Sequence, residues 1–359
     1  MDQGNRTVIE EYLSSTLQKR VQVLSLEPLG NGKVKEMKSF GYGKPYLIRC
    51  VAGENTMELV LETMSENSFG HDHFSDRAQN LLWYYSASNR LPKHAQSLDV
   101  GAFTKDRQMI SLGKAEEFFV LNEFVPGYEY AADLQRIQTT GSLEPLDEQK
   151  VVALAQYLGE IHSLKKDLPT LYVRRIRELL GHGECIMGLI DNYPPNDPVA
   201  TVEILQQVEM ACLKWRWNLK RMAHRLSQVH GDFHPWNILF RKGLDFTVLD
   251  RSRGEWGEPA DDVTSMTINY VFHSLQKSGT LYSTFEKMFL KFWETYLDAT
   301  NDSEILKTVQ PFYAWRLLVL LNPVWYPRLA IPVREQLLRF VKNVLAVETF
   351  APERINELL

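Results

Sequence analysis

The stretch His230-Gly231-Asp232-Phe233-His234-Pro235-Trp236-Asn237 is the most informative part of this chain. Four residues separate its carboxylate, Asp232, from its carboxamide, Asn237. Apolar residues flank the stretch, with Val229 before it and Ile238-Leu239-Phe240 after it. Because apolar flanks tend to be buried, the sequence predicts a tight loop held between buried segments. Such a loop can direct both polar side chains into one cleft.

A β-hairpin is predicted directly after this loop. The runs 238–240 and 246–250 are mostly apolar and resemble short strands, and the polar turn 241–245 joins them. Asp250 ends the second run, and Gly257-Glu258-Pro259-Ala260-Asp261-Asp262-Val263 follows. Each signal alone also fits a surface turn or an ordinary aspartate at a strand end. The joint spacing of the two motifs is much harder to obtain by chance.

In this spacing the chain resembles the aminoglycoside phosphotransferase and choline kinase-like family. The residues in register with the family pattern are His230, Asp232, Asn237, Asp250, Gly257, Pro259 and Asp262. Glu258 replaces the aspartate that is usual between the glycine and the proline. The resemblance implies a catalytic base at Asp232 and metal ligands at Asn237 and Asp250. It also implies that Asp262 braces the loop and that His230 supports it from below.

The resemblance implies an Mg²⁺-dependent phosphotransferase that moves the γ-phosphate of ATP or GTP to a hydroxyl of a small molecule. Asp232 would accept the hydroxyl proton or orient it. Two alternatives stay open. One is a choline/ethanolamine-type or protein-directed kinase, which performs the same chemistry on another acceptor. The other is a non-catalytic pseudokinase that only binds a nucleotide.

Composition sets bounds on the class of protein. A chain of 359 residues exceeds the usual size of a single core, so two lobes are expected. A net charge of −5 argues against a nucleic-acid partner. The three widely spaced cysteines favour reduced thiols and a cytoplasmic location. No apolar run is long enough to predict a membrane span.

The expected fold is α+β and, by the resemblance, two-lobed and protein-kinase-like. Residues 1–124 are expected to form a strand-rich, nucleotide-binding lobe, and 125–359 a helical lobe with the catalytic loop and substrate site. Period-2 and apolar patterns predict strands at 21–26, 46–51, 57–62, 108–112 and 118–123, with one helix after Asp76. Helical periodicity predicts helices after Asp147 and from Asp197 to Leu226.

Candidate nucleotide contacts are less distinctive. Glycines at Gly41 and Gly43, followed by Lys44, could let a loop approach phosphates closely. The rival is Gly30-Asn31-Gly32-Lys33. Asn122 and Phe124 precede a Pro-Gly break, at the position where the family bonds adenine through its backbone. This position favours the adenine-binding hinge over the alternative, a plain strand-to-loop turn.

The main departure from the family is Glu62, which lies about where a phosphate-binding lysine is expected. The register could slip and place Glu62 on the solvent face. Alternatively, Lys44, Arg49 or Arg77 could supply the cation, or nucleotide binding could be weak.

The nature of the acceptor stays open in the sequence. Glu255, Glu258 and Asp261 could hold an amine. Arg251 and Arg253 could instead hold a phosphate or an acidic acceptor.

Overall fold

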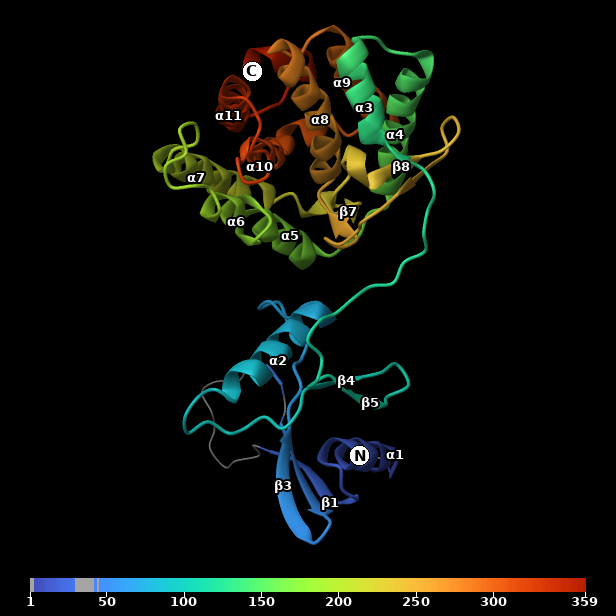
Figure 1. Ribbon diagram of the computed structural model, residues 1–359, viewed down its shortest axis with the longest axis vertical. Helices are drawn as coiled ribbons and strands as arrows, with labels where there is room; N and C mark the ends of the chain where they lie inside the picture. The colour runs from blue at the N-terminus through green and yellow to red at the C-terminus, as the bar shows by residue number, and fades with distance from the viewer. Residues whose placement is uncertain (1–2, 30–41, 44) are drawn as a thin grey trace. The chain divides into compact units, whose positions relative to one another are not determined.

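The computed structural model describes residues 3–29, 42–43 and 45–359. It divides into two compact units, Met1–Asn122 and Glu123–Leu359. The first unit contains a three-stranded sheet, and the second is mainly helical (Figure 1). This distribution confirms the predicted α+β class.

The N-terminal unit is built on an antiparallel sheet with the strand order β1-β2-β3. The strands are β1 (Val21–Pro28), β2 (Tyr46–Ala52) and β3 (Asn55–Leu61). The pairing of Cys50 with Met57 fixes the register of the β2–β3 hairpin. Helix α1 (Gln3–Leu17), which the sequence patterns did not predict, adds Ile9 and Leu13 to the core of this unit.

Helix α2 (Phe74–Ser88) begins at a capping box between His73 and Asp76, which satisfies backbone N–H groups of the first turn. A short hairpin follows, formed by β4 (Gly101–Phe103) and β5 (Met109–Ser111). The predicted strand at 118–123 is wrong. This apolar segment forms no ladder with any strand that the structure describes, and its side chains are exposed. Apolar composition without a partner strand does not make a strand.

The C-terminal unit is an assembly of helices around one core. Its helices are α3 (Tyr130–Thr140), α4 (Pro145–Ser163), α5 (Pro169–Gly181), α6 (Ile186–Asp191), α7 (Val202–Leu219), α8 (Ala260–Ser278), α9 (Ser283–Thr300), α10 (Val309–Leu321), α11 (Ile331–Ala346) and α12 (Ile355–Leu358). Helix α8 is central: almost every residue to Leu275 is buried, and it packs against α9 and α10 (Figure 1).

Helix boundaries in this unit follow local polar signals. Helix α4 begins at Pro145, and Asp147 completes a capping box with Glu144. Helix α7 begins at Val202, later than predicted, because the carboxylate of Asp197 already accepts hydrogen bonds from Val199 and Ala200 in a separate turn. The helix also ends at Leu219, short of the predicted Leu226.

Two small sheets hold the 230–237 loop. β7 (Ser227–Gln228) pairs with β10 (Trp256–Gly257) before and after the loop region. β8 (Ile238–Phe240) and β9 (Phe246–Val248) form the predicted hairpin, and β6 (Tyr128–Glu129) joins β8 as a third strand.

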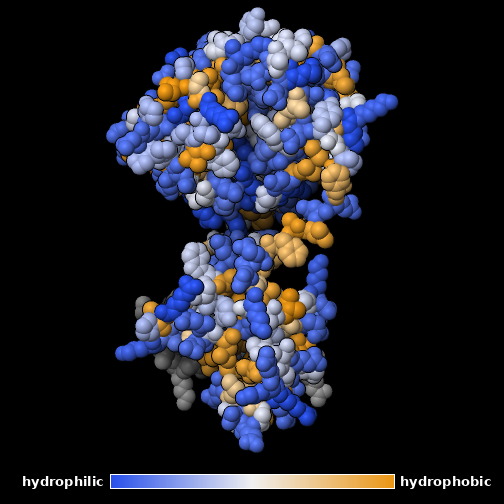
Figure 2. Space-filling model, in the orientation of Figure 1, coloured by the Kyte–Doolittle hydropathy of each residue, from blue (hydrophilic) through white to orange (hydrophobic). Residues whose placement is uncertain are grey.

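The visible face of the C-terminal unit in Figure 2 is mostly hydrophilic, with scattered apolar side chains. Within the described residues, no helix is long and apolar enough to cross a membrane.

Candidate active site

The 230–237 loop begins shortly after β7 with Gly231 in a left-handed conformation, and hydrogen bonds hold its first residues in place. Gly231 has φ +89°, a conformation that glycine adopts without strain. The backbone N–H of Val229 donates to the carbonyl of Glu255 at 3.0 Å. Arg251 donates to the Val229 carbonyl at 2.8 and 3.0 Å, so its guanidinium fastens the loop.

Asp262, at the start of α8, binds the same loop through hydrogen bonds to its backbone. Its carboxylate accepts hydrogen bonds from the backbone N–H groups of His230 and Gly231, both at 2.7 Å. His162 of α4 lies 3.1 Å from the same carboxylate and 2.9 Å from the hydroxyl of Tyr296. Burial acts to raise the pKa of Asp262, but the hydrogen bonds from His162 and His230 outweigh it and lower the pKa.

Asp232 is partly buried and lies between cations. Its Oδ1 accepts from Nη1 of Arg316 at 2.7 Å and from Nη1 of Arg253 at 3.1 Å. Its Oδ2 lies 3.6 Å from Nε2 of His234. Burial acts to raise the pKa of Asp232. His234 and the two arginines outweigh burial and hold that pKa well below its usual value, so the carboxylate stays ionised.

The two arginines are themselves held by the ring of Trp315. The guanidinium carbon of Arg316 lies 3.8 Å from the ring centroid, and that of Arg253 lies 4.8 Å from it. Arg316 also donates to Asp261 at 2.5 Å and to the carbonyl of Gly231 at 3.2 Å. Asp232 is therefore fixed by α10 as well as by its own loop.

Asn237 and Asp250 lie at the same end of the β8–β9 hairpin. The backbone N–H of Leu249 donates to the carbonyl of Asn237 at 2.8 Å, one step beyond the pair Ile238 and Val248. The Asn237 carboxamide also donates to the backbone carbonyl of Asp232 at 3.1 Å. Asp250 is exposed and has φ +57°, an uncommon conformation for a non-glycine residue. Side-chain oxygens of this kind are the donors that Mg²⁺ accepts.

Glu258, the residue that departs from the family pattern, is buried and serves the fold. Its carboxylate accepts from Nε and Nη2 of Arg225 at 2.8 to 3.1 Å and from the hydroxyl of Tyr172 at 2.7 Å. Arg225 also pairs with Asp302 at 2.7 Å. Glu258 is 2% exposed, so it is not available to hold an amine of an acceptor, which corrects that expectation.

The candidate nucleotide contacts belong to other parts of the chain. Gly43 lies in the N-terminal unit, where a Cβ would meet the carbonyl oxygen of Thr63 at 1.8 Å. Asn122 and Phe124 are exposed and lie on either side of the boundary between the units. Gly41, Lys44 and the rival segment 30–33 lie outside the described residues.

Glu62 follows β3 directly and is exposed. By the alternation of side chains along the strand, it falls on the same exposed face of β3 as Glu58 and Val60. Two of the cations considered as substitutes have protein partners. Arg49 pairs with Glu58 at 2.8 Å, and Arg77 donates to the carbonyl of His71 at 2.8 Å.

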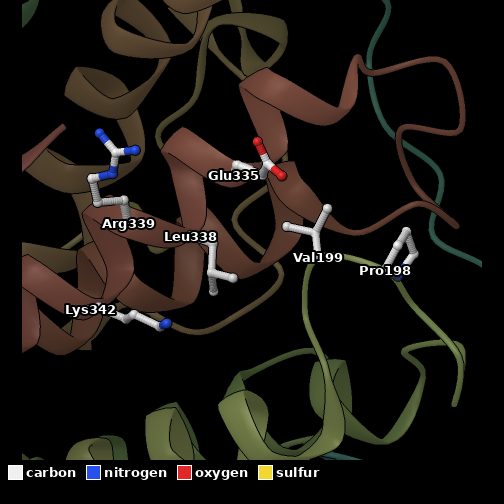
Figure 3. Close-up of a pocket in the computed structure, with 6 residues that line it drawn as sticks. All are labelled: Pro198, Val199, Glu335, Leu338, Arg339 and Lys342. Atoms are coloured by element: carbon white, nitrogen blue, oxygen red, sulfur yellow. The ribbon is translucent and has the colours of Figure 1, made fainter.

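Two cavities of the described residues differ in their relation to the motif. A cavity of about 250 Å³ lies between α11 and the turn before α7 and contains no motif residue (Figure 3). It is lined by Pro198, Val199, Glu335, Leu338, Arg339 and Lys342. A second cavity of about 220 Å³ reaches His230, Asp250 and Arg251, with Tyr157 of α4 in its wall.

Sequence reasoning did not identify Arg316 as a site residue. Arg316 is the only charged residue in the sequence of α10, and a lone charge in an apolar helix was the available signal. His162 is buried beneath Asp262, and both of its ring nitrogens have partners, the hydroxyl of Tyr296 and the carboxylate of Asp262.

A loop that carries an aspartate and an asparagine, followed by a hairpin that ends in a second aspartate, is an arrangement typical of kinases, which transfer a phosphoryl group to a hydroxyl. Residues 104–294, more than half of the 359, match the model of the Phosphotransferase enzyme family. The chain belongs to this family, which confirms the resemblance inferred from its motifs. A comparison with curated proteins finds no match.

Several solved structures are similar to this chain at low identity. The choline kinase LicA from Streptococcus pneumoniae is 14% identical, with 95% of this chain and 98% of that chain covered and a TM-score of 0.36. The amicoumacin kinase hAmiN is 15% identical, with both chains fully covered and a TM-score of 0.39. The aminoglycoside phosphotransferase APH(2'')-Ib is 15% identical, with 97% and 100% covered and a TM-score of 0.33.

Proposed function

We propose that this phosphotransferase moves the γ-phosphate of ATP or GTP to a hydroxyl of a small molecule in an Mg²⁺-dependent reaction. Asp232 acts on the acceptor hydroxyl. Asn237 and Asp250 hold the metal ion, whose charge offsets the charge that develops on the phosphates. Asp262 and His230 keep the loop in place.

The nucleotide is proposed to contact the N-terminal unit and the segment that follows it. The residues proposed for this role are Gly41, Gly43, Lys44, Asn122 and Phe124. Support for this assignment comes from the chain's family membership and from the positions of these residues along the sequence.

The environment of Asp232 is the observation that carries the proposal. A carboxylate that two arginines keep ionised is a poor acceptor for a proton in the ground state, but a good acceptor for a hydrogen bond. Asp232 therefore orients the hydroxyl oxygen toward the γ-phosphorus and takes up the proton late. The bond from the γ-phosphorus to the bridging oxygen breaks, the bond to the acceptor oxygen forms, and the nucleoside diphosphate leaves.

The first test is a thermal-shift titration with ATP and GTP, each with and without Mg²⁺. A ligand that binds only the folded state stabilises it by about 2.7 kcal/mol at a hundredfold excess over its dissociation constant. We expect a shift that requires Mg²⁺ and that selects one nucleotide.

An acceptor screen then follows release of the nucleoside diphosphate, with Asp232→Asn as the inactive control. The panel includes choline, ethanolamine, aminoglycosides and a hydroxyl-bearing peptide. Release that depends on a small-molecule acceptor, with the wild type and not with the control, supports the proposal. Release with the peptide alone would instead indicate a protein-directed kinase. Absence of any nucleotide-dependent shift or release would overturn it.

A further inference from the structure

Arg316 reaches the candidate active site from a helix that lies outside the matched family segment. Residue 316 follows the end of that segment at 294 and lies 84 positions after Asp232. Its Nη1 donates to Oδ1 of Asp232 at 2.7 Å, and its Nη2 donates to the carbonyl of Gly231 at 3.2 Å. One planar group therefore contacts both the side chain and the backbone of the loop.

The guanidinium of Arg316 is held from several sides. Asp261 accepts from Nη2 at 2.5 Å, and the Trp315 ring lies 3.8 Å from the guanidinium carbon. Only 9% of the side chain is exposed. A buried and stacked guanidinium that bonds several groups at once has little freedom to move, so it can define the position of its partner.

The two oxygens of Asp232 are not equivalent in this arrangement. Oδ1 accepts from both Arg316 and Arg253, at 2.7 and 3.1 Å. Oδ2 lies 3.6 Å from Nε2 of His234, beyond the usual hydrogen-bond distance. The arginines therefore leave Oδ2 as the oxygen with capacity to accept a further hydrogen bond.

We propose that Arg316 is a positioning residue for phosphoryl transfer: it fixes Oδ1 of Asp232 so that Oδ2 faces the acceptor hydroxyl. This inference rests on the proposed role of Asp232. Arg316 touches neither substrate in the reaction and acts through the carboxylate. Since a displacement of about 1 Å can lower a rate by roughly a hundredfold, loss of this contact is expected to lower kcat far more than it changes KM for the nucleotide.

A second buried arginine supplies a matched control. Arg334 of α11 is 5% exposed, and its Nη2 donates to Asp197 at 2.6 Å. Its Nε donates to the carbonyl of Leu321 at 2.8 Å. Arg334 makes no contact with Asp232, so its replacement reports the loss of a buried ion pair alone.

The experiment compares Arg316→Met and Arg334→Met for kcat, both KM values and thermal stability. We expect Arg316→Met to lose about a hundredfold in kcat, with KM for the nucleotide changed less than about threefold. Added methylguanidinium should restore part of the rate to Arg316→Met. Arg334→Met should lose stability and keep its kcat.

Arg316→Lys and Arg334→Lys decide the question if a methionine variant does not fold. A lysine keeps the charge but cannot contact Asp232, Asp261 and the Gly231 carbonyl with the same geometry, so kcat should fall by more than about tenfold at position 316 only. Equal kcat in the two lysine variants, or wild-type kcat in folded Arg316→Met, would overturn the inference.

Asp232→Asn separates this inference from the function on which it rests. If Asp232→Asn is active, the proposed function fails. If Asp232→Asn is inactive while Arg316→Met has wild-type kcat, only the role of Arg316 fails.

Discussion

The carboxylate of Asp262 accepts a hydrogen bond from the backbone N–H of His230 at 2.7 Å, which ties the 230–237 loop to the first turn of α8. Removal of this buried acceptor leaves N–H groups of the loop without partners. We therefore expect Asp262→Ala to lower the free energy of unfolding by about 3 kcal/mol. Urea denaturation measures the loss. Asp298→Asn on the surface of α9 is the control and should stay within about 0.5 kcal/mol of wild type.

Asp232→Asn tests the chemical step. The carboxamide keeps the size of the side chain but cannot take the hydroxyl proton, so we expect kcat to fall by at least about a hundredfold. Nucleotide affinity, measured by calorimetry, should stay nearly unchanged because Asp232 is not proposed to bind the nucleotide. A parallel loss of affinity and turnover would count against the role assigned to it.

Asp250→Ala tests the metal site. Asp250 is exposed at the end of the hairpin, so the substitution should leave the fold intact. We expect the Mg²⁺-dependent part of the thermal shift with nucleotide to disappear, while any shift without Mg²⁺ stays as in the wild type. An unchanged Mg²⁺-dependent shift would remove Asp250 from the metal site.

Glu258→Asp restores the residue usual in the family and should nevertheless destabilise this protein. The shorter side chain draws the carboxylate away from Arg225 and Tyr172, which it contacts in a buried site. We expect a loss of about 1–3 kcal/mol in the free energy of unfolding, measured in urea. Glu160→Asp, at an exposed position on α4, should lose less than about 1 kcal/mol. Equal losses in the two variants would contradict the structural role of Glu258.

His273 of α8 predicts a dependence of stability on pH. Burial removes the ring from water and lowers its pKa from 6.5 to about 4. Its Nε2 has no hydrogen-bond partner among the described residues. Between pH 6.5 and 4, this histidine is protonated in the unfolded chain but stays neutral in the folded chain. The free energy of unfolding therefore decreases as the pH falls through this window. The full loss is about 3 kcal/mol.

His273→Asn isolates this effect, since its carboxamide can still donate to Gln138 as the ring Nδ1 does. Denaturation midpoints of the two proteins are compared from pH 7 to pH 4. We expect the wild type to lose more stability than the variant. Parallel profiles would show that another group causes the acid dependence.

The 230–237 loop and the hairpin after it could be predicted because their signals are local. Every residue of those two motifs lies within one short segment, so the spacing of their residue types along the chain was enough to predict them. Arg316 could not be predicted to meet Asp232, because that contact depends on how α10 packs against α8. The wrong strand at 118–123 has a related cause. β-propensity describes side chains, whereas a strand also requires a partner that the local sequence does not specify.

The 84-residue interval between Asp232 and Arg316 also orders events during synthesis. At about 5–20 residues per second, a ribosome delivers the arginine roughly 4 to 17 seconds after the aspartate. A nascent chain that has reached residue 300, or a fragment that ends there, already carries every residue of the family motif. It still lacks Arg316, one of the two arginines that contact its aspartate, so domain boundaries drawn from the motif alone would omit this contact.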